Sequence, residues 1–266
     1  MPELPEVQTV VNDLKQVIIA KEITQIEEFY PGTLRLTCDE SNYCSLVLDV
    51  QRRGKYILIL LESNFLIIVH LRMTGKLIFE EENKDLLKHE RARIYFSDDT
   101  YLRFDDVRTF GTIDCLNKSE LPQYFSRLGI EPLSEEFTYK YLKDNYNSVT
   151  SPIKTFLLDQ SKIAGLGNIY VCEVLYRAKI HPLTQLKELK PKQLKLLVET
   201  IKEVLSQAIE CNGTTISDYR RVDDKTGSFQ NFLQVYGKEI CPLGHPIHRK
   251  KIGGRSTYFC PICQQK

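Results

Sequence analysis

Residues 56–71 read YILILLESNFLIIVHL and form the most apolar segment of this 266-residue chain. The polar tripeptide Glu62-Ser63-Asn64 divides the segment into two runs. A membrane-spanning helix needs about 20 consecutive apolar residues, and neither run approaches that length. Two short apolar runs around a polar turn are typical of paired, buried β-strands. We therefore expect the core of a β-domain here and no membrane association.

Short strand-like runs continue on both sides of this pair. They are separated by turn signals and read LRLTC (34–38), SLVLDV (45–50), KLIFEE (76–81), RIYFS (93–97) and YLRFD (101–105). Several strands at this spacing predict an antiparallel sandwich or barrel.

The chain begins MPELPEVQTV, which predicts a helix preceded by two residues that the helix does not need. Apolar residues recur there at helical spacing, and Pro5-Glu6 suits a first helical turn. Pro2 and Glu3 stand in front of that turn, so a proline and a carboxylate at the chain end call for another explanation.

From about residue 119 the apolar period becomes helical. The helical runs are SELPQYFSRLG (119–129), SEEFTYKYLKDNY (134–146), PIKTFLLDQ (152–160), NIYVCEVLYRA (168–178) and KPKQLKLLVETIKEVLSQAIE (190–210). The first two open with Ser-Glu, a helix-start signal. Residues 211–231 are polar without a clear period and predict a loop. We expect an α+β multidomain chain with a β-domain at 1–130, a helical domain at 131–231 that ends in the loop 213–231, and a small hairpin at 232–266.

Charge is unevenly distributed along the chain. Residues 232–266 carry six basic side chains and one acidic side chain, whereas the remainder carries 30 basic and 34 acidic ones. A basic tail on a mildly acidic body indicates a local anionic partner such as nucleic acid, although a solvated basic surface gives the same pattern.

The same tail offers the ligands of a metal site. Cys260 and Cys263 form a Cys-x2-Cys pair that can place two thiolates on one tetrahedral ion. Cys241 and His245 are the expected partners, with His248 as a second choice for the fourth ligand. A tail of this length has too small a hydrophobic core to fold alone. We therefore expect one structural Zn²⁺ to stabilise it; the alternative is a metal-free hairpin. No signal peptide is recognised, so free thiols and a reducing cytoplasm are expected.

Two glycine-rich turns complete the set of candidate sites. Gly165-Leu166-Gly167-Asn168 precedes a helical run with Asn168 at the helix cap, where exposed amides favour an anion. Gly253-Gly254-Arg255 predicts a tight hairpin turn that exposes a guanidinium able to bind a phosphate. Each of these segments, taken alone, is more often a plain turn.

Taken in order, these motifs resemble the bacterial formamidopyrimidine-DNA glycosylase / endonuclease VIII family of base-excision repair enzymes. The resemblance extends over essentially the whole chain. It rests on Pro2-Glu3, Arg53-Gly54-Lys55-Tyr56, His70-Leu71-Arg72-Met73-Thr74-Gly75, Asp106-Val107-Arg108-Thr109-Phe110-Gly111, Leu158-Asp159-Gln160, Gly165-Leu166-Gly167-Asn168-Ile169-Tyr170, Val235-Tyr236-Gly237 and the final Cys-Pro-Ile-Cys-Gln. It implies an N-terminal β-sandwich with a leading helix, a helix–two-turn–helix domain and a C-terminal zinc finger.

The resemblance also implies a chemistry and a partner. After removal of Met1, Pro2 would attack the deoxyribose of damaged double-stranded DNA, as an α-amine with a pKa of about 8 can. Glu3 would move protons, and Lys55 would hold a phosphate beside the nucleophile. Because a glycosylase takes its base out of the stack, Met73, Arg108 and Phe110 would fill the void, although a core role for Met73 and Phe110 is the alternative. Phosphate contacts are expected from Asn168, Tyr236 and Arg255, and more weakly from His70.

Several departures indicate a divergent member. Leu243 stands where the family's finger has its second cysteine, Cys172 stands where the family often has an acid, and Lys88-His89-Glu90-Arg91 replaces a segment usually richer in histidine. We expect the branch that removes oxidised purines, with oxidised pyrimidines as the second choice. A non-catalytic binder of damaged DNA is a third reading, but it would gain little from keeping Pro2, Glu3 and Lys55. Nothing in the chemistry requires a dimer, so a monomer is expected.

Overall fold

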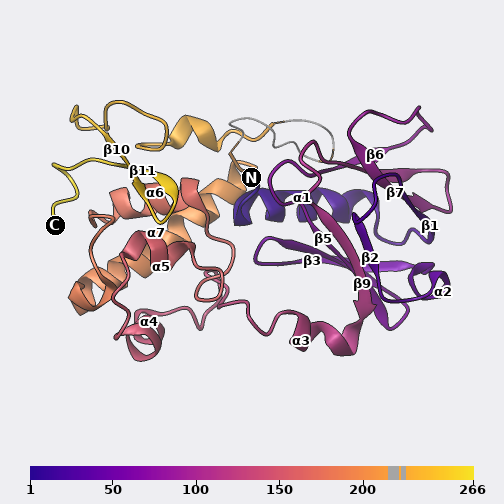
Figure 1. Cartoon of the computed structure of the whole chain (residues 1–266), viewed down its shortest axis with the longest axis horizontal. Coiled ribbons are helices and arrows are strands. Elements are labelled where there is room, and N and C mark those ends of the chain that lie inside the picture. The colour runs from indigo at the N-terminus through magenta and orange to yellow at the C-terminus, as the bar shows by residue number, and fades with distance from the viewer. Residues whose placement is uncertain (215–221, 223–225) are drawn as a thin grey trace. The chain divides into compact units, whose positions relative to one another are not determined.

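The computed structural model of the chain describes residues 1–214, 222 and 226–266. They form two compact units, one made of 1–127 with 211–228 and the other of 128–210 with 229–266. Figure 1 traces both units along the chain. The expected loop at 213–231 falls in part on residues 215–221 and 223–225, which lie outside the described residues.

The first unit contains two β-sheets. One has the strand order β1-β7-β8-β6 and is antiparallel; the other has the order β2-β9-β5-β4-β3, with β2 and β9 parallel and its other pairs antiparallel. The strands are β1 (Ile23–Glu28), β2 (Leu34–Leu36), β3 (Val47–Arg53), β4 (Tyr56–Leu61), β5 (Phe65–His70), β6 (Lys76–Glu80), β7 (Glu90–Phe96), β8 (Tyr101–Asp105) and β9 (Thr112–Asn117).

The apolar segment at 56–71 forms the two strands expected of it. Strands β4 and β5 pair from Tyr56↔His70 to Leu60↔Leu66, around the Glu62-Ser63-Asn64 turn. Both lie inside the five-stranded sheet, which is why their apolar residues run on without alternation. Strand β9 pairs with the other side of β5 and was not predicted, because Asp114 interrupts its apolar pattern.

Helix α1 (Leu4–Val17) completes the core of this unit. Its residues Val7, Val10, Val11 and Leu14 are at most 1% exposed and pack into the cluster formed by the strands. Burial of each such side chain contributes about 1.5–3 kcal/mol, so this face anchors the start of the chain. The predicted leading helix is confirmed.

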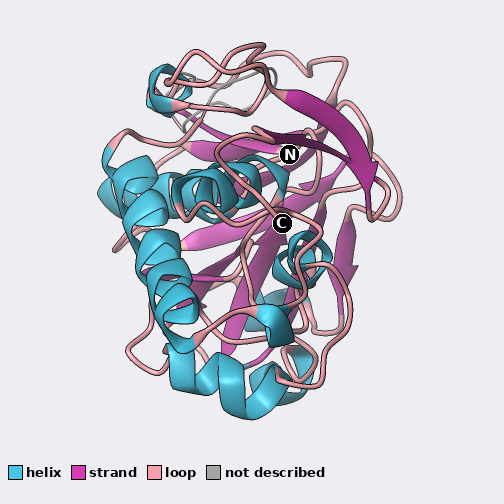
Figure 2. Ribbon diagram, turned by 90° about the vertical axis from the view of Figure 1, so that its left-hand side faces the viewer, coloured by secondary structure: helices cyan, strands magenta, loops and turns pink. Residues whose placement is uncertain are grey.

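The second unit is helical and ends in a hairpin. Its helical segments are α4 (Tyr139–Tyr146), α5 (Ile153–Leu158), α6 (Asn168–Arg177), η2 (Leu186–Glu188), α7 (Pro191–Glu210) and η3 (Phe229–Phe232). Helix α5 packs against α6, and α7 packs against both α6 and α4; Figure 2 shows the helices in cyan. The first unit adds the short segments α2 (Glu40–Tyr43), η1 (Lys118–Glu120) and α3 (Leu121–Tyr124).

Helix α4 begins later than its Ser-Glu signal predicted. The prediction of a start at Ser134 is wrong, because Thr138 is the N-cap and its hydroxyl accepts the Tyr141 N–H at 3.1 Å. Phe137 is fully buried just before this cap. An apolar anchor and a second capping residue thus moved the start of the helix by about one turn.

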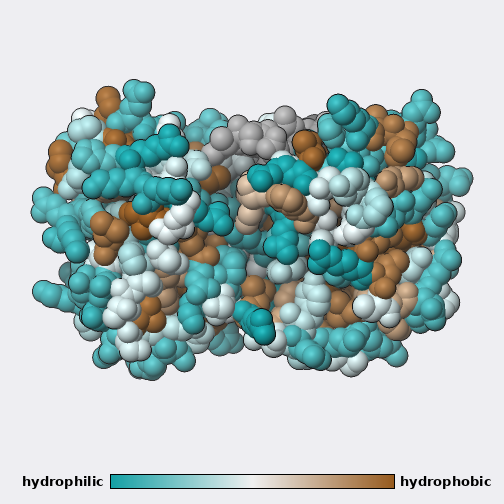
Figure 3. Space-filling model, in the orientation of Figure 1, coloured by the Kyte–Doolittle hydropathy of each residue, from teal (hydrophilic) through white to brown (hydrophobic). Residues whose placement is uncertain are grey.

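The C-terminal hairpin pairs β10 (His248–Ile252) with β11 (Arg255–Phe259). Gly253 and Gly254 have φ of 56° and 78°, as the tight hairpin turn predicted here requires. Residues 248–251 and Arg255 are exposed. Figure 3 shows hydrophilic side chains over the part of the surface where Figure 1 places β10.

Among the described helices, none is both long and apolar enough to cross a membrane.

Candidate active site and nucleic-acid interface

Pro2 and Glu3 are buried at the start of helix α1, behind an exposed Met1. Glu3 is the N-cap of the helix, and its backbone N–H donates to Glu6 Oε2 at 2.8 Å. We predicted that the helix does not need Glu3. This prediction is wrong, because Glu3 and Glu6, three residues apart, form a capping pair. The helix fixes the backbone next to Pro2, and its positive end lies there.

The other carboxylate oxygen of Glu6 holds a second segment. Glu6 Oε1 accepts the Thr214 N–H at 2.7 Å. A Cβ on Gly213, which has φ of 79°, would lie 2.9 Å from the same oxygen. The buried Glu6 side chain thus ties residues 213–214 to the first turn of α1. Sequence analysis missed this role, since the two segments are about 200 positions apart.

Lys55, directly before β4, and His70, the last residue of β5, are neighbours. Both are nearly buried, at 5% and 6% exposure. Burial, with the charges of Arg72 and Lys55, lowers the pKa of His70 to about 3. Its Nδ1 accepts the Arg72 N–H at 2.9 Å, so the proton of the neutral ring is on Nε2. Neutral His70 can therefore donate one hydrogen bond to an acceptor such as a phosphate oxygen.

The loop at 106–111 is shaped by Asp106, which is 1% exposed. Its carboxylate accepts the Gly111 N–H at 2.7 Å, the Arg108 N–H at 3.2 Å and the Thr74 hydroxyl. The neighbouring residue Thr109 has φ of 58°, a conformation that β-branched residues rarely adopt. One buried carboxylate thus holds the backbone of the loop at Arg108 and at Gly111.

This loop presents its side chains outward. Phe110 is 53% exposed and Arg108 is exposed, with its guanidinium 5.0 Å from the centre of the Phe110 ring. A core role is therefore excluded for Phe110. Met73 is half-buried in the adjacent segment, and Thr74 links that segment to Asp106. The structure brings the Met73 segment and the loop together.

In the second unit, Asn168 is oriented by a buried lysine. Asn168 is the first residue of α6 and Gly167 is the N-cap, which corrects the expected cap by one position. Lys154, fully buried, donates to Asn168 Oδ1 at 2.7 Å and to Cys172 Sγ at 3.1 Å. Asn168 Nδ2 donates to the Ser256 carbonyl at 2.8 Å. Both ends of the carboxamide are fixed, and with one partner for Nδ2 among the described residues, that nitrogen can donate a second hydrogen bond. Lys154 was not recognised in the sequence, where it looked like an ordinary polar helix position.

The segment at 234–236 is held by a second fully buried carboxylate. Glu173 on α6 accepts the N–H groups of Gln234, Val235 and Tyr236 at 2.8, 3.0 and 2.8 Å. The Tyr236 ring lies 5.0 Å from that of Tyr258 on β11. Tyr236 is thereby fixed through both its backbone and its ring. Arg255 is exposed at the start of β11.

Four side chains of the tail gather into one cluster, and they are the predicted set. The ligand atoms of Cys241, His245, Cys260 and Cys263 lie within 4.8 Å of one another. Cys241 Sγ is 3.9 Å from Cys263 Sγ and 3.7 Å from His245 Nδ1. A tetrahedral ion with metal–sulfur bonds of about 2.3 Å separates its sulfur ligands by about 3.8 Å, so the donor set fits such an ion. His248 is exposed on β10 and is not in the cluster.

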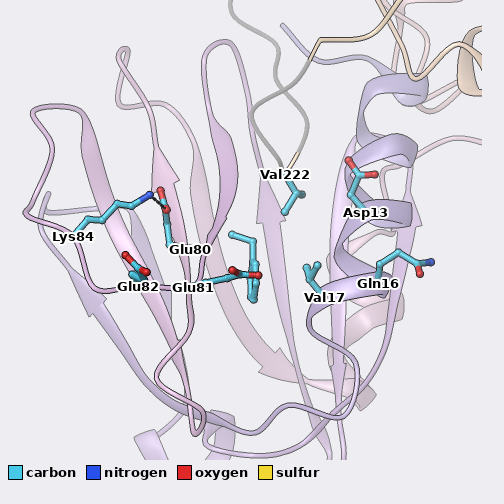
Figure 4. A pocket seen from close by; sticks show the side chains of 9 residues that line it. Asp13, Gln16, Val17, Glu80, Glu81, Glu82, Lys84 and Val222 are labelled. Carbon is cyan, nitrogen blue, oxygen red and sulfur yellow. Dashed lines mark hydrogen bonds and ion pairs between the residues drawn. The ribbon is translucent and has the colours of Figure 1, made fainter.

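A cavity of about 530 Å³ lies elsewhere in the first unit. Figure 4 shows Asp13, Gln16 and Val17 of α1 on one side, facing residues 80–82 and Lys84 across it. Its acidic lining disfavours a nucleic-acid phosphate, and none of Pro2, Glu3 and Lys55 lines it. The cavity is therefore not part of the candidate site.

Comparisons with known proteins agree along the whole chain. Residues 1–113 match the family model of the formamidopyrimidine-DNA glycosylase N-terminal domain, and residues 128–220 match that of the H2TH domain of the same enzymes. The formamidopyrimidine-DNA glycosylases of Protochlamydia amoebophila and Mycoplasma genitalium are 41% and 37% identical; each alignment covers 100% of this chain and 100% or 96% of the relative.

Solved structures give the same result. The complex of Lactococcus lactis Fpg with DNA containing an abasic site is similar, with a TM-score of 0.92 and 39% identity over 99% of this chain and 100% of that one. The wild-type protein of the same organism bound to DNA containing an oxidised pyrimidine has a TM-score of 0.91 and 38% identity, with 100% of both chains covered.

Proposed function

The chain belongs to the formamidopyrimidine-DNA glycosylase family, and on that premise we propose that the amine of Pro2 is its nucleophile. The protein is a base-excision repair DNA glycosylase with AP-lyase activity. The observation that carries the assignment of Pro2 is its place at the buried start of α1, beside a carboxylate whose backbone the helix holds.

The Pro2 nitrogen becomes reactive once Met1 is removed. In the Met1-Pro2 peptide bond it is an amide, whereas the freed secondary amine can attack C1′ of the damaged nucleotide. The bond from C1′ to the base breaks, the base leaves with a proton, and an iminium remains. This electron sink acidifies the proton on C2′, whose loss expels the 3′ phosphate and cleaves the strand. The positive end of α1 disfavours protonation of an amine placed there.

Glu3 transfers the protons of these steps. A carboxylic acid can protonate the ring oxygen of the sugar as it opens, and the resulting carboxylate can accept the C2′ proton. The capping contact with Glu6 holds the Glu3 backbone, so its side chain works from a fixed position. Lys55 and neutral His70 bind the phosphate flanking the lesion, where the Lys55 charge also favours the neutral amine.

Met73, Arg108 and Phe110 fill the space that the extruded base leaves. An exposed aromatic ring can wedge between base pairs, and an exposed guanidinium can donate to the unpaired partner base. Asn168, Tyr236 and Arg255 bind backbone phosphates through a free amide proton, a phenol and a guanidinium. The partner is therefore double-stranded DNA with a damaged base or an abasic site.

Oxidised purines, 8-oxoguanine and formamidopyrimidines, are the proposed substrates. The relatives at 36–41% identity are named for formamidopyrimidine lesions. Oxidised pyrimidines are the second candidate, because the Lactococcus lactis protein has been crystallised with DNA that contains one. Cleavage rates measured on DNA with oxidised purines, oxidised pyrimidines and abasic sites would rank these substrates. We propose that the enzyme acts as a monomer in the bacterial cytoplasm, where its DNA substrate lies.

Zn²⁺ is the ion proposed for the four-residue cluster. Three thiolates and one imidazole are a common tetrahedral zinc set, and the ion would supply the stability that the short hairpin lacks. One equivalent of zinc is expected in the purified protein. His245→Ala should reduce it, and His248→Ala, the matched control, should not; the reverse result would assign the fourth ligand to His248.

The test of the nucleophile uses one polypeptide in two forms. A cleavable extension is fused directly before Pro2, and the protein is assayed with the extension retained and after its removal. With borohydride and abasic DNA, we expect a covalent complex only from the cleaved form, because only that form has a free amine. A trapped complex from the uncleaved form, or none from either, would contradict the proposal. Equal DNA binding by both forms controls for folding.

A further inference from the structure

We propose that Cys38 and Cys115 are a site of oxidative modification, at which a peroxide converts two free thiols into an intramolecular disulfide. Both residues belong to the first unit and contain free thiols. Their Sγ atoms are 2.7 Å apart. A disulfide bond is about 2.05 Å long, so the two sulfurs need to approach by less than 1 Å.

The backbone around the pair is already fixed. Strand β2 ends at Leu36, which is the register partner of Cys115 on β9. The Thr37 hydroxyl donates to the Cys115 carbonyl at 2.9 Å, and the Thr37 N–H donates to the same carbonyl at 3.5 Å. Cys38 follows directly, so the strand pairing delivers its side chain to Cys115. A disulfide would join segments that the sheet already holds together.

The two thiols differ in their access to solvent. Cys38 is half-buried, whereas Cys115 is 1% exposed and lines a cavity of about 280 Å³ together with Arg35 and Tyr124. Burial raises the pKa of the Cys115 thiol. Cys38 is therefore the residue that meets the oxidant, and Cys115 is the residue that resolves the product.

The chemistry balances with hydrogen peroxide as the oxidant. The Cys38 thiolate attacks one peroxide oxygen, the O–O bond breaks, and hydroxide leaves to become water on taking up a proton. The resulting sulfenic acid is attacked by the Cys115 sulfur; the S–S bond forms, the S–O bond breaks, and the Cys115 proton leaves with the hydroxyl as a second water. Two thiols lose two electrons, and one peroxide becomes two waters.

The other cysteines lack such a partner or are committed elsewhere. Cys44 is half-buried, as Cys38 is, but its thiol donates to the Thr24 carbonyl at 3.0 Å. Cys172 is fully enclosed beside Lys154. Within the described part of the chain, the remaining close sulfur contacts belong to the metal cluster at 241–263. The geometry therefore selects one pair.

The experiment oxidises the zinc-loaded, full-length protein with one equivalent of hydrogen peroxide. Free thiols are then blocked with N-ethylmaleimide, and the protein is digested without reduction for mass spectrometry. We expect a peptide pair linked through Cys38 and Cys115 that dithiothreitol separates. A crosslink that closes so long a chain segment should also raise the melting temperature by about 5 °C.

Three variants make the result decisive. Cys38→Ser should lose both the linked peptide and the rise in melting temperature, and Cys115→Ala should do the same. Cys44→Ser, the matched control, should keep both. The proposal fails if both thiols are alkylated after oxidation, or if Cys38 ends as a sulfinic acid or in a mixed disulfide without Cys115. If Cys115→Ala does not fold, wild-type protein and Cys38→Ser still decide the question.

Discussion

The loop at 106–111 and the segment at 234–236 are each held by a buried carboxylate of their own. The two carboxylates differ in how far along the chain they lie from the backbone groups that they bind. Asp106 holds Arg108 and Gly111, which lie two and five residues away. Glu173 holds Gln234, Val235 and Tyr236, which lie about 60 residues away on another element. Each carboxylate satisfies backbone N–H groups that have no partner in a helix or sheet.

The difference shows two ways to build a rigid loop. The Asp106 carboxylate bonds mainly within its own short segment, and the Thr74 hydroxyl is its partner from outside that segment. The Asp106 backbone also pairs with His89 and Arg91 at the start of β7. The Glu173 segment depends on packing between α6 and the tail, so its shape exists only when the second unit is folded. Hydrogen bonds to charged acceptors contribute about 1.5–3 kcal/mol each, so both carboxylates are strong determinants of shape. Substitution of each carboxylate can measure how much the loop and the segment depend on it.

The largest effect is expected from Glu173→Gln. The neutral amide keeps one acceptor oxygen but turns donor protons toward a backbone N–H, so the free energy of unfolding should fall by about 4 kcal/mol. Tyr236 would lose its fixed backbone, and affinity for abasic DNA should fall about tenfold, equivalent to about 1.4 kcal/mol. Chemical denaturation and a binding titration measure both. Glu203→Gln on the exposed face of α7 is the control; equal losses in the two variants would refute the role of Glu173.

A smaller loss, about 3 kcal/mol, is expected from Asp106→Asn, because fewer backbone N–H groups depend on it. Excision of a damaged base should slow more than borohydride trapping on abasic DNA, since the loop acts when a base must be extruded. Single-turnover kinetics on the two substrates separate these steps. Asp99→Asn is the control, because Asp99 is exposed with φ of 63°, which asparagine tolerates. Equal slowing on both substrates would show that the loop does not act in extrusion.

The smallest effect depends on pH and concerns His70. Its pKa is about 3 in the folded protein and about 6.5 in the unfolded chain. Between these values the unfolded state binds the proton and the folded state does not, so stability falls as the pH drops below about 6.5. The loss at pH 5 should be about 2 kcal/mol relative to pH 8. His70→Asn should remove that part of the pH dependence, whereas His248→Asn should leave it unchanged; identical pH profiles for wild type and His70→Asn would contradict the assignment.

Local patterns in the sequence predicted much of the fold. The apolar runs and the turn at 62–64 predicted β4 and β5, and the helical spacing of apolar residues predicted α1. The local patterns did not predict elements whose position depends on contacts between residues far apart in the sequence. Strand β9 carries Asp114 and Cys115 in buried positions, and α4 starts at the cap chosen by the burial of Phe137.

In the candidate site, too, residues in local motifs were predicted and residues that act through distant partners were not. Residues that would touch DNA stand in short motifs and were predicted from them, and so was the metal cluster of the tail. The residues that hold them were not recognised. Glu6, Lys154 and Glu173 have partners about 200, 14 and 60 positions away, and no local pattern identifies those partners. The capping contact of Glu6 with Glu3 is local, but it does not reveal the contact with Thr214.

The left-handed backbone of Thr109 has a consequence for anyone who wants to borrow this loop. An L-residue in that conformation is disfavoured by about 1–2 kcal/mol, and a β-branched one is among the least suited to it. A linear peptide copied from residues 105–112 would rarely adopt the shape that presents Arg108 and Phe110. The loop could be transplanted between two strands of another scaffold together with Asp106 and Thr74, whereas the free peptide would not keep its shape.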